Sequence, residues 1–149
     1  IIPDCEPKSS PAQMISAPIV KKHQLEAIPM GYIIAGEGCV AGYIGQARYL
    51  SFKHNKLAVG YSLAAETLGM RFVYLEAGSG APEPIPPKMI GAVTKYADIP
   101  IIVGGGIREP NAALAAKKAG ASAIVTGTLV EEESEVEDRI REIVKAIAD

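Results

Sequence analysis

Three short apolar runs that end in small residues limit most strongly what this chain can fold into. They are residues 73–80 (VYLEAGSG), 101–106 (IIVGGG) and 123–128 (AIVTGT). Continuous apolar runs of this length are typical of buried parallel strands, whose carboxyl ends open into turns. α/β proteins bind their ligands at those ends. Because two consecutive glycine-rich turns each precede a predicted helix, the pattern favours a phosphate-binding site.

Strand and helix patterns alternate along the rest of the chain. An opening helix is expected over about residues 12–25, where Pro18 indicates a kink or a late start. Strands are expected at 31–36, 71–77, 101–103 and 122–126, with helices starting at Asn55, Pro87 and Pro110 and a fourth in the C-terminal segment. That last helix has an apolar stripe and an acidic first turn at 131–133. The connection 37–52 is expected to be a functional or mobile loop.

The predicted order is therefore one helix followed by four strand–helix units. The chain of 149 residues fits a single domain, 1–149, with an irregular stretch at 1–11 and a partial (β/α) barrel at 12–149. Four such units are half of a TIM barrel, which usually needs roughly 200 residues or more. Three explanations stay open: a missing N-terminal half, a half-barrel that dimerises, or a small open doubly wound sheet.

Composition excludes several classes of protein. Apolar residues make up 48% and charged residues 21% of the chain, and the formal net charge is -2. These values are typical of a soluble globular domain and give no reason to expect a nucleic-acid partner. The absence of a signal peptide or long apolar run predicts a cytoplasmic protein with no membrane anchor. Cys5 and Cys39 are too few for a disulfide scaffold.

Four segments carry a more specific likeness. They are 31–48 (GYIIAGEGCVAGYIGQAR), 69–90 (GMRFVYLEAGSGAPEPIPPKMI), 99–110 (IPIIVGGGIREP) and 119–132 (AGASAIVTGTLVEE). In order and spacing they resemble the second half of the TIM (β/α)8 barrel of geranylgeranylglyceryl phosphate synthases and their bacterial prenylglyceryl phosphate synthase relatives. The sequence YLEAGSGAP is highly specific, whereas GGGIR and GT recur in many phosphate-binding barrels. The resemblance implies about the last four βα units of such a barrel.

The activity implied by the resemblance is prenyl transfer in archaeal ether-lipid biosynthesis. In that reaction the C3 hydroxyl of sn-glycerol 1-phosphate attacks C1 of geranylgeranyl diphosphate, and diphosphate leaves. The resemblance also implies Mg²⁺, whose carboxylate ligand comes from the first strand of the family's barrel with help from the second. This chain lacks a match to both strands, and Asp4 lies in the wrong context, so no metal ligand is assigned. Family members commonly self-associate, which predicts a homo-oligomer.

The turns supply the candidate site residues. Backbone amides of Gly104, Gly105, Gly106 and Gly127, with the Thr128 hydroxyl, are expected to bind the phosphate. Glu76 can accept a hydrogen bond from a glycerol hydroxyl and take up its proton. The resemblance implies that Glu76 acts as the general base in this way. The remaining substrate-binding candidates are Tyr74, Leu75, Ala77, Gly78, Ser79 and Gly80. The alternative is structural: the glycines serve tight turns, and Glu76 pairs with Arg71 or Arg108.

The prenyl tail needs an apolar groove, for which Tyr32, Ile34, Tyr43 and Ile44 are candidate wall residues. Segment 37–46 looks like the family's mobile element over the active site. Arg48 and Arg108 could steer an anionic substrate. Two other functions compete: another phosphate-binding TIM-barrel enzyme, and a catalytically silent phosphate-binding half-barrel that is stable only through self-association.

Overall fold

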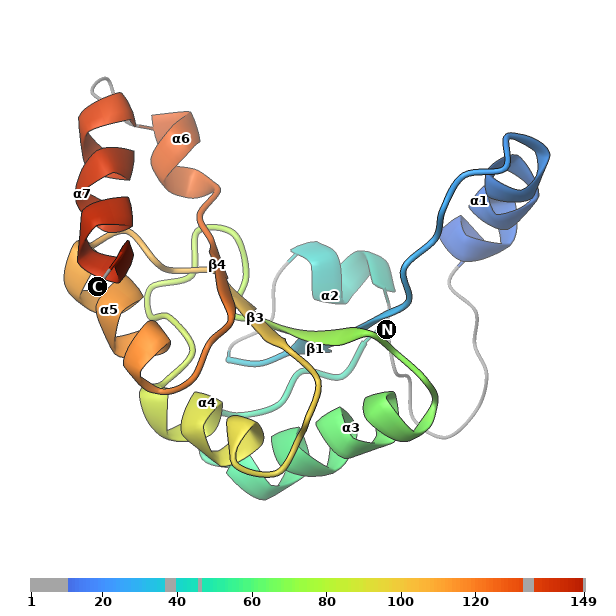
Figure 1. Ribbon diagram of the computed structural model, residues 1–149, viewed down its shortest axis with the longest axis horizontal. Helices are drawn as coiled ribbons and strands as arrows, with labels where there is room; N and C mark the ends of the chain where they lie inside the picture. Colours follow the sequence, from blue (N-terminus) through green and yellow to red (C-terminus); the bar gives the residue numbers. More distant parts are fainter. Residues whose placement is uncertain (1–10, 37–39, 46, 133–135, 149) are drawn as a thin grey trace.

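The computed structural model describes residues 11–36, 40–45, 47–132 and 136–148. Its elements follow the alternating order expected from the sequence (Figure 1). The strands are β1 (Met30–Ile34), β2 (Phe72–Glu76), β3 (Ile101–Gly104) and β4 (Ala123–Val125). The helices are α1 (Pro11–Lys22), α2 (Val40–Gly45), α3 (Asn55–Thr67), α4 (Pro87–Thr94), α5 (Pro110–Lys118), α6 (Thr128–Glu132) and α7 (Val136–Ala148).

The four strands form one parallel sheet in the order β1-β2-β3-β4. Tyr32 is in register with Tyr74, and Glu76 is in register with Gly104. A doubly wound sheet reverses its strand order at a switch point, whereas this order runs in one direction as in a TIM barrel. The prediction of four parallel βα units is therefore confirmed, and the doubly wound alternative is excluded.

One face of the sheet packs against helices and forms the core. Val73, Leu75 and Val103 are fully buried on this face, while α3, α4 and α5 follow one another around it and α7 packs on α5 (Figure 1). Side chains alternate between faces along a strand, so Tyr32 and Tyr74 face the other way, and both are only partly buried. The sheet thus has a closed helical face and an open concave face.

The helix α2 was not expected, because the sequence predicts a loop at 37–52. It has only six residues, two of them glycine, so the sequence carries little helical signal there, and its Val40 and Tyr43 are exposed. The helix nevertheless packs on the concave face, where a Cβ at Gly42 would lie 3.5 Å from Ile34 Cδ1. The loop prediction is therefore wrong for residues 40–45, which form α2. Residues 37–39 and 46 lie outside the described part of the chain.

The ends of the chain differ from the expected boundaries. The first helix begins at Pro11 and contains Pro18, so the late start considered from the sequence is wrong. The C-terminal segment forms two helices instead of one, and the first turn of α7 carries Glu137 and Asp138. The acidic run at 131–133 is consequently not the first turn of α7. Asp4, Cys5 and Cys39 lie outside the described residues.

Candidate functional site

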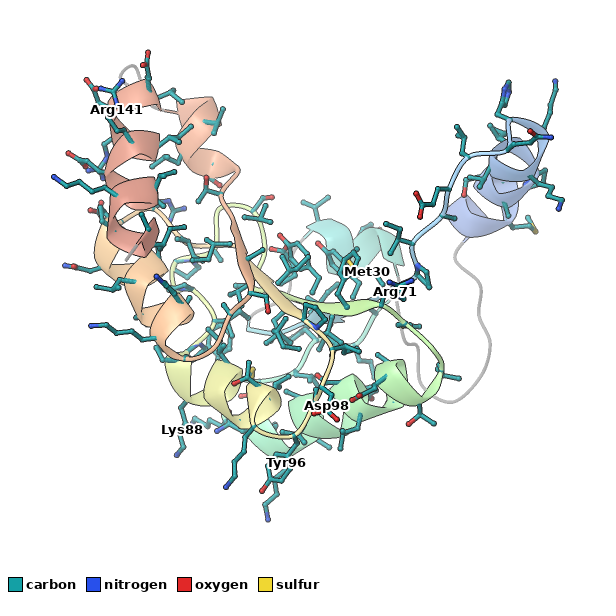
Figure 2. The ribbon with its side chains drawn as sticks, in the orientation of Figure 1. Met30, Arg71, Lys88, Tyr96, Asp98 and Arg141 are labelled. Carbon is teal, nitrogen blue, oxygen red and sulfur yellow. The ribbon has the colours of Figure 1, made fainter. Side chains whose placement is uncertain are left out.

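Glu76 ends β2 at the carboxyl edge of the sheet and is almost completely buried, with 7% of its surface exposed. The Gly78 N–H donates a hydrogen bond of 2.6 Å to Glu76 Oε1, and the Tyr32 hydroxyl donates one of 2.8 Å to Oε2. A buried carboxylate needs such donors because it has lost its water. Arg71 is exposed at the opposite end of β2, next to Met30 in Figure 2, and Arg108 donates to the Ala81 carbonyl. Within the described residues no ion pair joins Glu76 to either arginine.

Tyr74 lies against the same carboxylate. Its ring stacks on Tyr32, with centroids 4.9 Å apart and an interplanar angle of 13°. Burial raises the pKa of Tyr74 well above its usual value, and the charge of Glu76 and a hydrogen bond to it raise it further. Tyr74 therefore keeps its proton at neutral pH and acts as a second phenol donor beside Glu76.

The glycines after β3 are required by close packing between turns. A Cβ at Gly104 would overlap the Tyr74 hydroxyl. Gly105 has a φ of +83°, and its Cβ would lie 2.6 Å from Glu76 Oε1. Gly106 has a φ of +70°, with backbone atoms of Glu83 2.8 Å from the Cβ position. The structural explanation left open by the sequence thus accounts for these three glycines, and their part in phosphate binding stays a prediction.

The turn after β4 is different. A Cβ at Gly127 would meet nothing within 4 Å, so this backbone faces open space. The next residue ties the turn to the loop after β2, because the Gly80 N–H donates a hydrogen bond of 3.1 Å to Thr128 Oγ1. The Thr128 hydroxyl hydrogen is left for another acceptor. This turn can offer an amide and a hydroxyl without moving.

The three turns enclose a small cleft of about 70 Å³ beside Glu76. A cavity of this size holds several water molecules, or a small polar group in their place. The lining residues are Tyr74, Glu76, Ser79, Gly105, Gly106, Ile107, Arg108, Val125, Thr126, Gly127 and Thr128. Seven of the predicted site residues are therefore brought together here: Tyr74, Glu76, Ser79, Gly105, Gly106, Gly127 and Thr128.

The other predicted site residues lie around this cleft or behind it. Leu75 is in the core on the helical face. Gly78 is buried behind the Glu76 carboxylate, and Gly104 is buried under the Tyr74 hydroxyl. Ala77 and Gly80 line a larger cleft of about 520 Å³, which shares Ser79 with the small cleft and extends to Phe52 and Lys53.

The candidate groove residues differ in exposure, and their role as a groove wall stays a prediction. Ile34 is 3% exposed, whereas Tyr43 is 87% exposed on α2. The side chain of Ile44 and part of segment 37–46 lie outside the described residues. Tyr32, a groove candidate from the sequence, donates a hydrogen bond to Glu76. This contact depends on the register of Tyr32 with Tyr74 on the neighbouring strand, which the sequence alone does not reveal.

Metal binding and membrane spanning were also considered. In the part of the chain that the structure describes, no group of three or more His, Cys, Asp or Glu side chains is arranged to hold a metal ion. Among the same residues, no helix has both the length and the apolar character needed to cross a bilayer.

Residues 11–147 match the model of the PcrB family. Among curated proteins, the chain is 54% identical over 120 residues to the geranylgeranylglyceryl phosphate synthase of Saccharolobus islandicus strain M.14.25, covering 80% of this chain and 47% of that protein. It is 49% identical over 137 residues to the synthase of Methanobrevibacter smithii, covering 91% and 55%. The chain thus spans about half the length of the curated relatives it matches.

Solved structures agree with these matches. The synthase of Thermoplasma acidophilum in complex with sn-glycerol-1-phosphate superimposes with a TM-score of 0.87 at 41% identity, covering 91% of this chain and 55% of that one. The synthase of Thermoplasma volcanium gives 0.79 at 36% identity, covering 93% and 58%. The four parallel strands therefore correspond to part of the TIM barrel of these proteins.

Proposed function

The chain belongs to the PcrB family, and from this premise we propose that it contributes the glycerol phosphate site of a prenyltransferase. The enzyme would join geranylgeranyl diphosphate to the C3 hydroxyl of sn-glycerol 1-phosphate. The observation that carries the proposal is the small cleft, in which a buried carboxylate and three turns at the carboxyl ends of neighbouring strands meet. The complex of the Thermoplasma acidophilum relative with sn-glycerol-1-phosphate supports this choice of ligand.

The two ends of the ligand need different groups. The phosphate would accept hydrogen bonds from the backbone at Gly105, Gly106 and Gly127 and from the Thr128 hydroxyl, all of which line the cleft. The glycerol hydroxyl would donate to Glu76, whose oxygens have lone pairs beyond those used by Gly78 and Tyr32. A ligand bound in this way has its alcohol next to a carboxylate.

Glu76 would act as the general base. As the C3 oxygen forms its bond to C1 of the allylic diphosphate, the hydroxyl proton passes to the carboxylate. The bond from C1 to the diphosphate oxygen breaks, and its electron pair leaves with diphosphate. The hydrogen bonds from Gly78 and Tyr32 hold the carboxylate in one orientation, so little reorganisation is needed during transfer.

Mg²⁺ does not fit the residues in hand. The resemblance to the family implies this ion for holding the diphosphate, yet the described residues contain no cluster of metal-ligating side chains. Among the described residues that line the small cleft, Glu76 is the one acidic side chain. No step of the mechanism above is therefore assigned to a metal held by the described part of the chain.

A second candidate is a phosphate-binding half-barrel without turnover of its own. The same lack of a metal cluster among the described residues favours it for the chain acting alone. Both proposals assume a single domain over residues 1–149, a cytoplasmic location and self-association. Catalysis by a whole barrel and binding by this chain are compatible, because the site that binds glycerol phosphate is the same in both.

A product assay tests whether the chain acting alone carries out the transfer. The chain is incubated with labelled geranylgeranyl diphosphate, Mg²⁺ and sn-glycerol 1-phosphate, and the ether product is extracted and identified. Formation of the ether supports the prenyltransferase. Binding of glycerol phosphate with no ether would support the silent half-barrel, and failure to bind would contradict both.

A further inference from the structure

We propose that Arg108 supplies the positive charge that binds the phosphate in the small cleft, and that it fixes the turn after β2 against the site. The inference rests on the proposed function and adds to it a specificity-determining residue. It depends on the charges that line the cleft, the contacts of the guanidinium and the support of its backbone.

The small cleft contains one basic and one acidic side chain among its described lining residues, Arg108 and Glu76. A phosphate bound beside a buried carboxylate would be repelled by it, because two like charges in a poorly solvated site interact strongly. A guanidinium in the same cleft offsets this repulsion and offers N–H donors that suit phosphate oxygens. The cleft therefore has the charge pattern of a phosphomonoester that also carries a hydroxyl group.

The guanidinium has a defined position. Arg108 is partly buried, and its Nη1 donates a hydrogen bond of 2.9 Å to the Ala81 carbonyl. This contact joins the turn after β3 to the turn after β2, at the point where Gly106 already packs against the backbone of Glu83. The other N–H groups of the fork are then available to a ligand in the cleft that Arg108 lines.

The backbone of Arg108 is also held from behind. Nη2 of Arg139, on α7, lies 3.4 Å from the Arg108 carbonyl oxygen and 2.7 Å from Glu109 Oε1. Arg139 thereby links α7 to the turn that carries Arg108. Because side chain and backbone each have a partner, the charge is preorganised, which reduces the entropy lost when a ligand binds.

The positions of Arg108 and Glu76 set the direction of the ligand. The phosphate lies toward Arg108 and the turn after β4, and the hydroxyl lies toward Glu76. The site should consequently prefer a glycerol phosphate to uncharged glycerol, and Arg108 should account for much of that preference.

Three variants separate charge from position. Arg108→Gln removes the charge and keeps an amide N–H for the Ala81 carbonyl. Arg108→Lys keeps the charge and loses the planar set of guanidinium N–H donors. Arg71→Gln is the matched control, since Arg71 is exposed at the amino end of β2, away from the cleft. Dissociation constants for sn-glycerol 1-phosphate and inorganic phosphate are measured by isothermal titration calorimetry, and melting temperatures confirm that each variant is folded.

The expected result is a loss of about tenfold or more in affinity for both ligands in Arg108→Gln, as for a lost charge-assisted hydrogen bond. Arg108→Lys should recover part of that loss, and Arg71→Gln should bind like the original chain. Equal affinities in folded Arg108→Gln and the original chain would overturn the inference, as would an equal loss in Arg71→Gln. If Arg108→Gln does not fold, folded Arg108→Lys decides: affinity retained within about tenfold supports the role of charge, and complete loss overturns it. If the original chain binds neither ligand, the proposed function itself fails.

Discussion

The carboxylate of Glu76 accepts hydrogen bonds within the protein from Gly78 and Tyr32, and the Tyr74 phenol is a further donor beside it. These contacts explain how a nearly buried acid stays compatible with the fold. From the sequence, the position of Glu76 at a strand end could be predicted, and so could its nearness to the glycine turns. Its contact with Tyr32 could not, because it depends on the register between β1 and β2.

Replacing Glu76 with Gln should abolish most of the turnover. The amide has nearly the same shape and can keep the Gly78 contact, but it cannot take up the proton of the attacking hydroxyl. We expect kcat to fall by about 100-fold or more, as for the loss of a general base, with little change in the melting temperature. Steady-state kinetics in a preparation that forms the ether test this, and near-full turnover would show that Glu76 is not the base.

Tyr74 should make stability depend on pH in the alkaline range. Its pKa is raised in the folded chain, so the unfolded chain loses this proton first as the pH rises above the ordinary tyrosine value of about 10. The stabilisation is fully present below that pH. Above it, Tyr74 lowers the free energy of unfolding by up to about 1.4 kcal/mol per pH unit, and by less where solvent screens the group.

Urea denaturation between pH 8 and about 11 measures this contribution. The fall in the free energy of unfolding per pH unit above about pH 10 should be smaller in Tyr74→Phe than in the original chain. Tyr96→Phe is the control, because Tyr96 is 57% exposed beside α4 (Figure 2). Identical slopes in all three proteins would mean that Tyr74 titrates normally.

At the scale of whole elements, the strands could be predicted best. Their apolar runs favour burial, and β2 and β3 are covered by helices on one face, whereas Ala123 and Val125 of β4 are exposed. α2 could not be predicted, because it has only six residues and two of them are glycine, which is a weak helix former. Among its described residues, Val40 and Tyr43 are exposed and Gly42 lies against Ile34 of the sheet.

The glycine turns differ in what they tolerate, and this yields a matched pair of substitutions. Gly105→Ala puts a side chain on a residue with a φ of +83° and into contact with Glu76 and Gly78. We expect it to lower the free energy of unfolding by about 2–4 kcal/mol. Gly127→Ala adds a methyl group in open space, so stability should change by less than about 1 kcal/mol.

Gly127→Ala should have little effect on stability, but it should affect the affinity for the phosphate ligand. If the backbone at 127 approaches the ligand, Gly127→Ala should weaken the binding of sn-glycerol 1-phosphate without destabilising the chain. Urea denaturation and calorimetry measure the two effects separately. A stable Gly105→Ala variant would contradict the packing described for this turn, and unchanged binding in Gly127→Ala would remove that backbone from the site.

At the scale of the whole molecule, the sheet has an open concave face. Tyr32 and Tyr74 on that face are only partly covered, and Val125 on the edge strand β4 is 42% exposed. α1 stands away from the sheet (Figure 1), and its Met14 and Ile15 are more than half exposed. Apolar surface and strand edges of this kind favour association with another chain.

We therefore expect the 149-residue chain to self-associate. Sedimentation velocity over a range of concentrations should show a species heavier than one chain, whose share rises with concentration. Ile15→Lys, which charges the exposed face of α1, tests whether that helix takes part. A single species with the mass of one chain at every concentration would contradict the prediction.

The central claim is that one small cleft binds the phosphate of sn-glycerol 1-phosphate at the turns and its alcohol at Glu76. Titration of the ¹⁵N-labelled chain with this ligand, followed by NMR, tests it directly. We predict that the amide signals of Gly105, Gly106, Gly127 and Thr128 shift together, with one dissociation constant. Shifts confined to Ser51, Phe52 and Lys53 at the larger cleft, or no shifts at saturating ligand, would contradict the account.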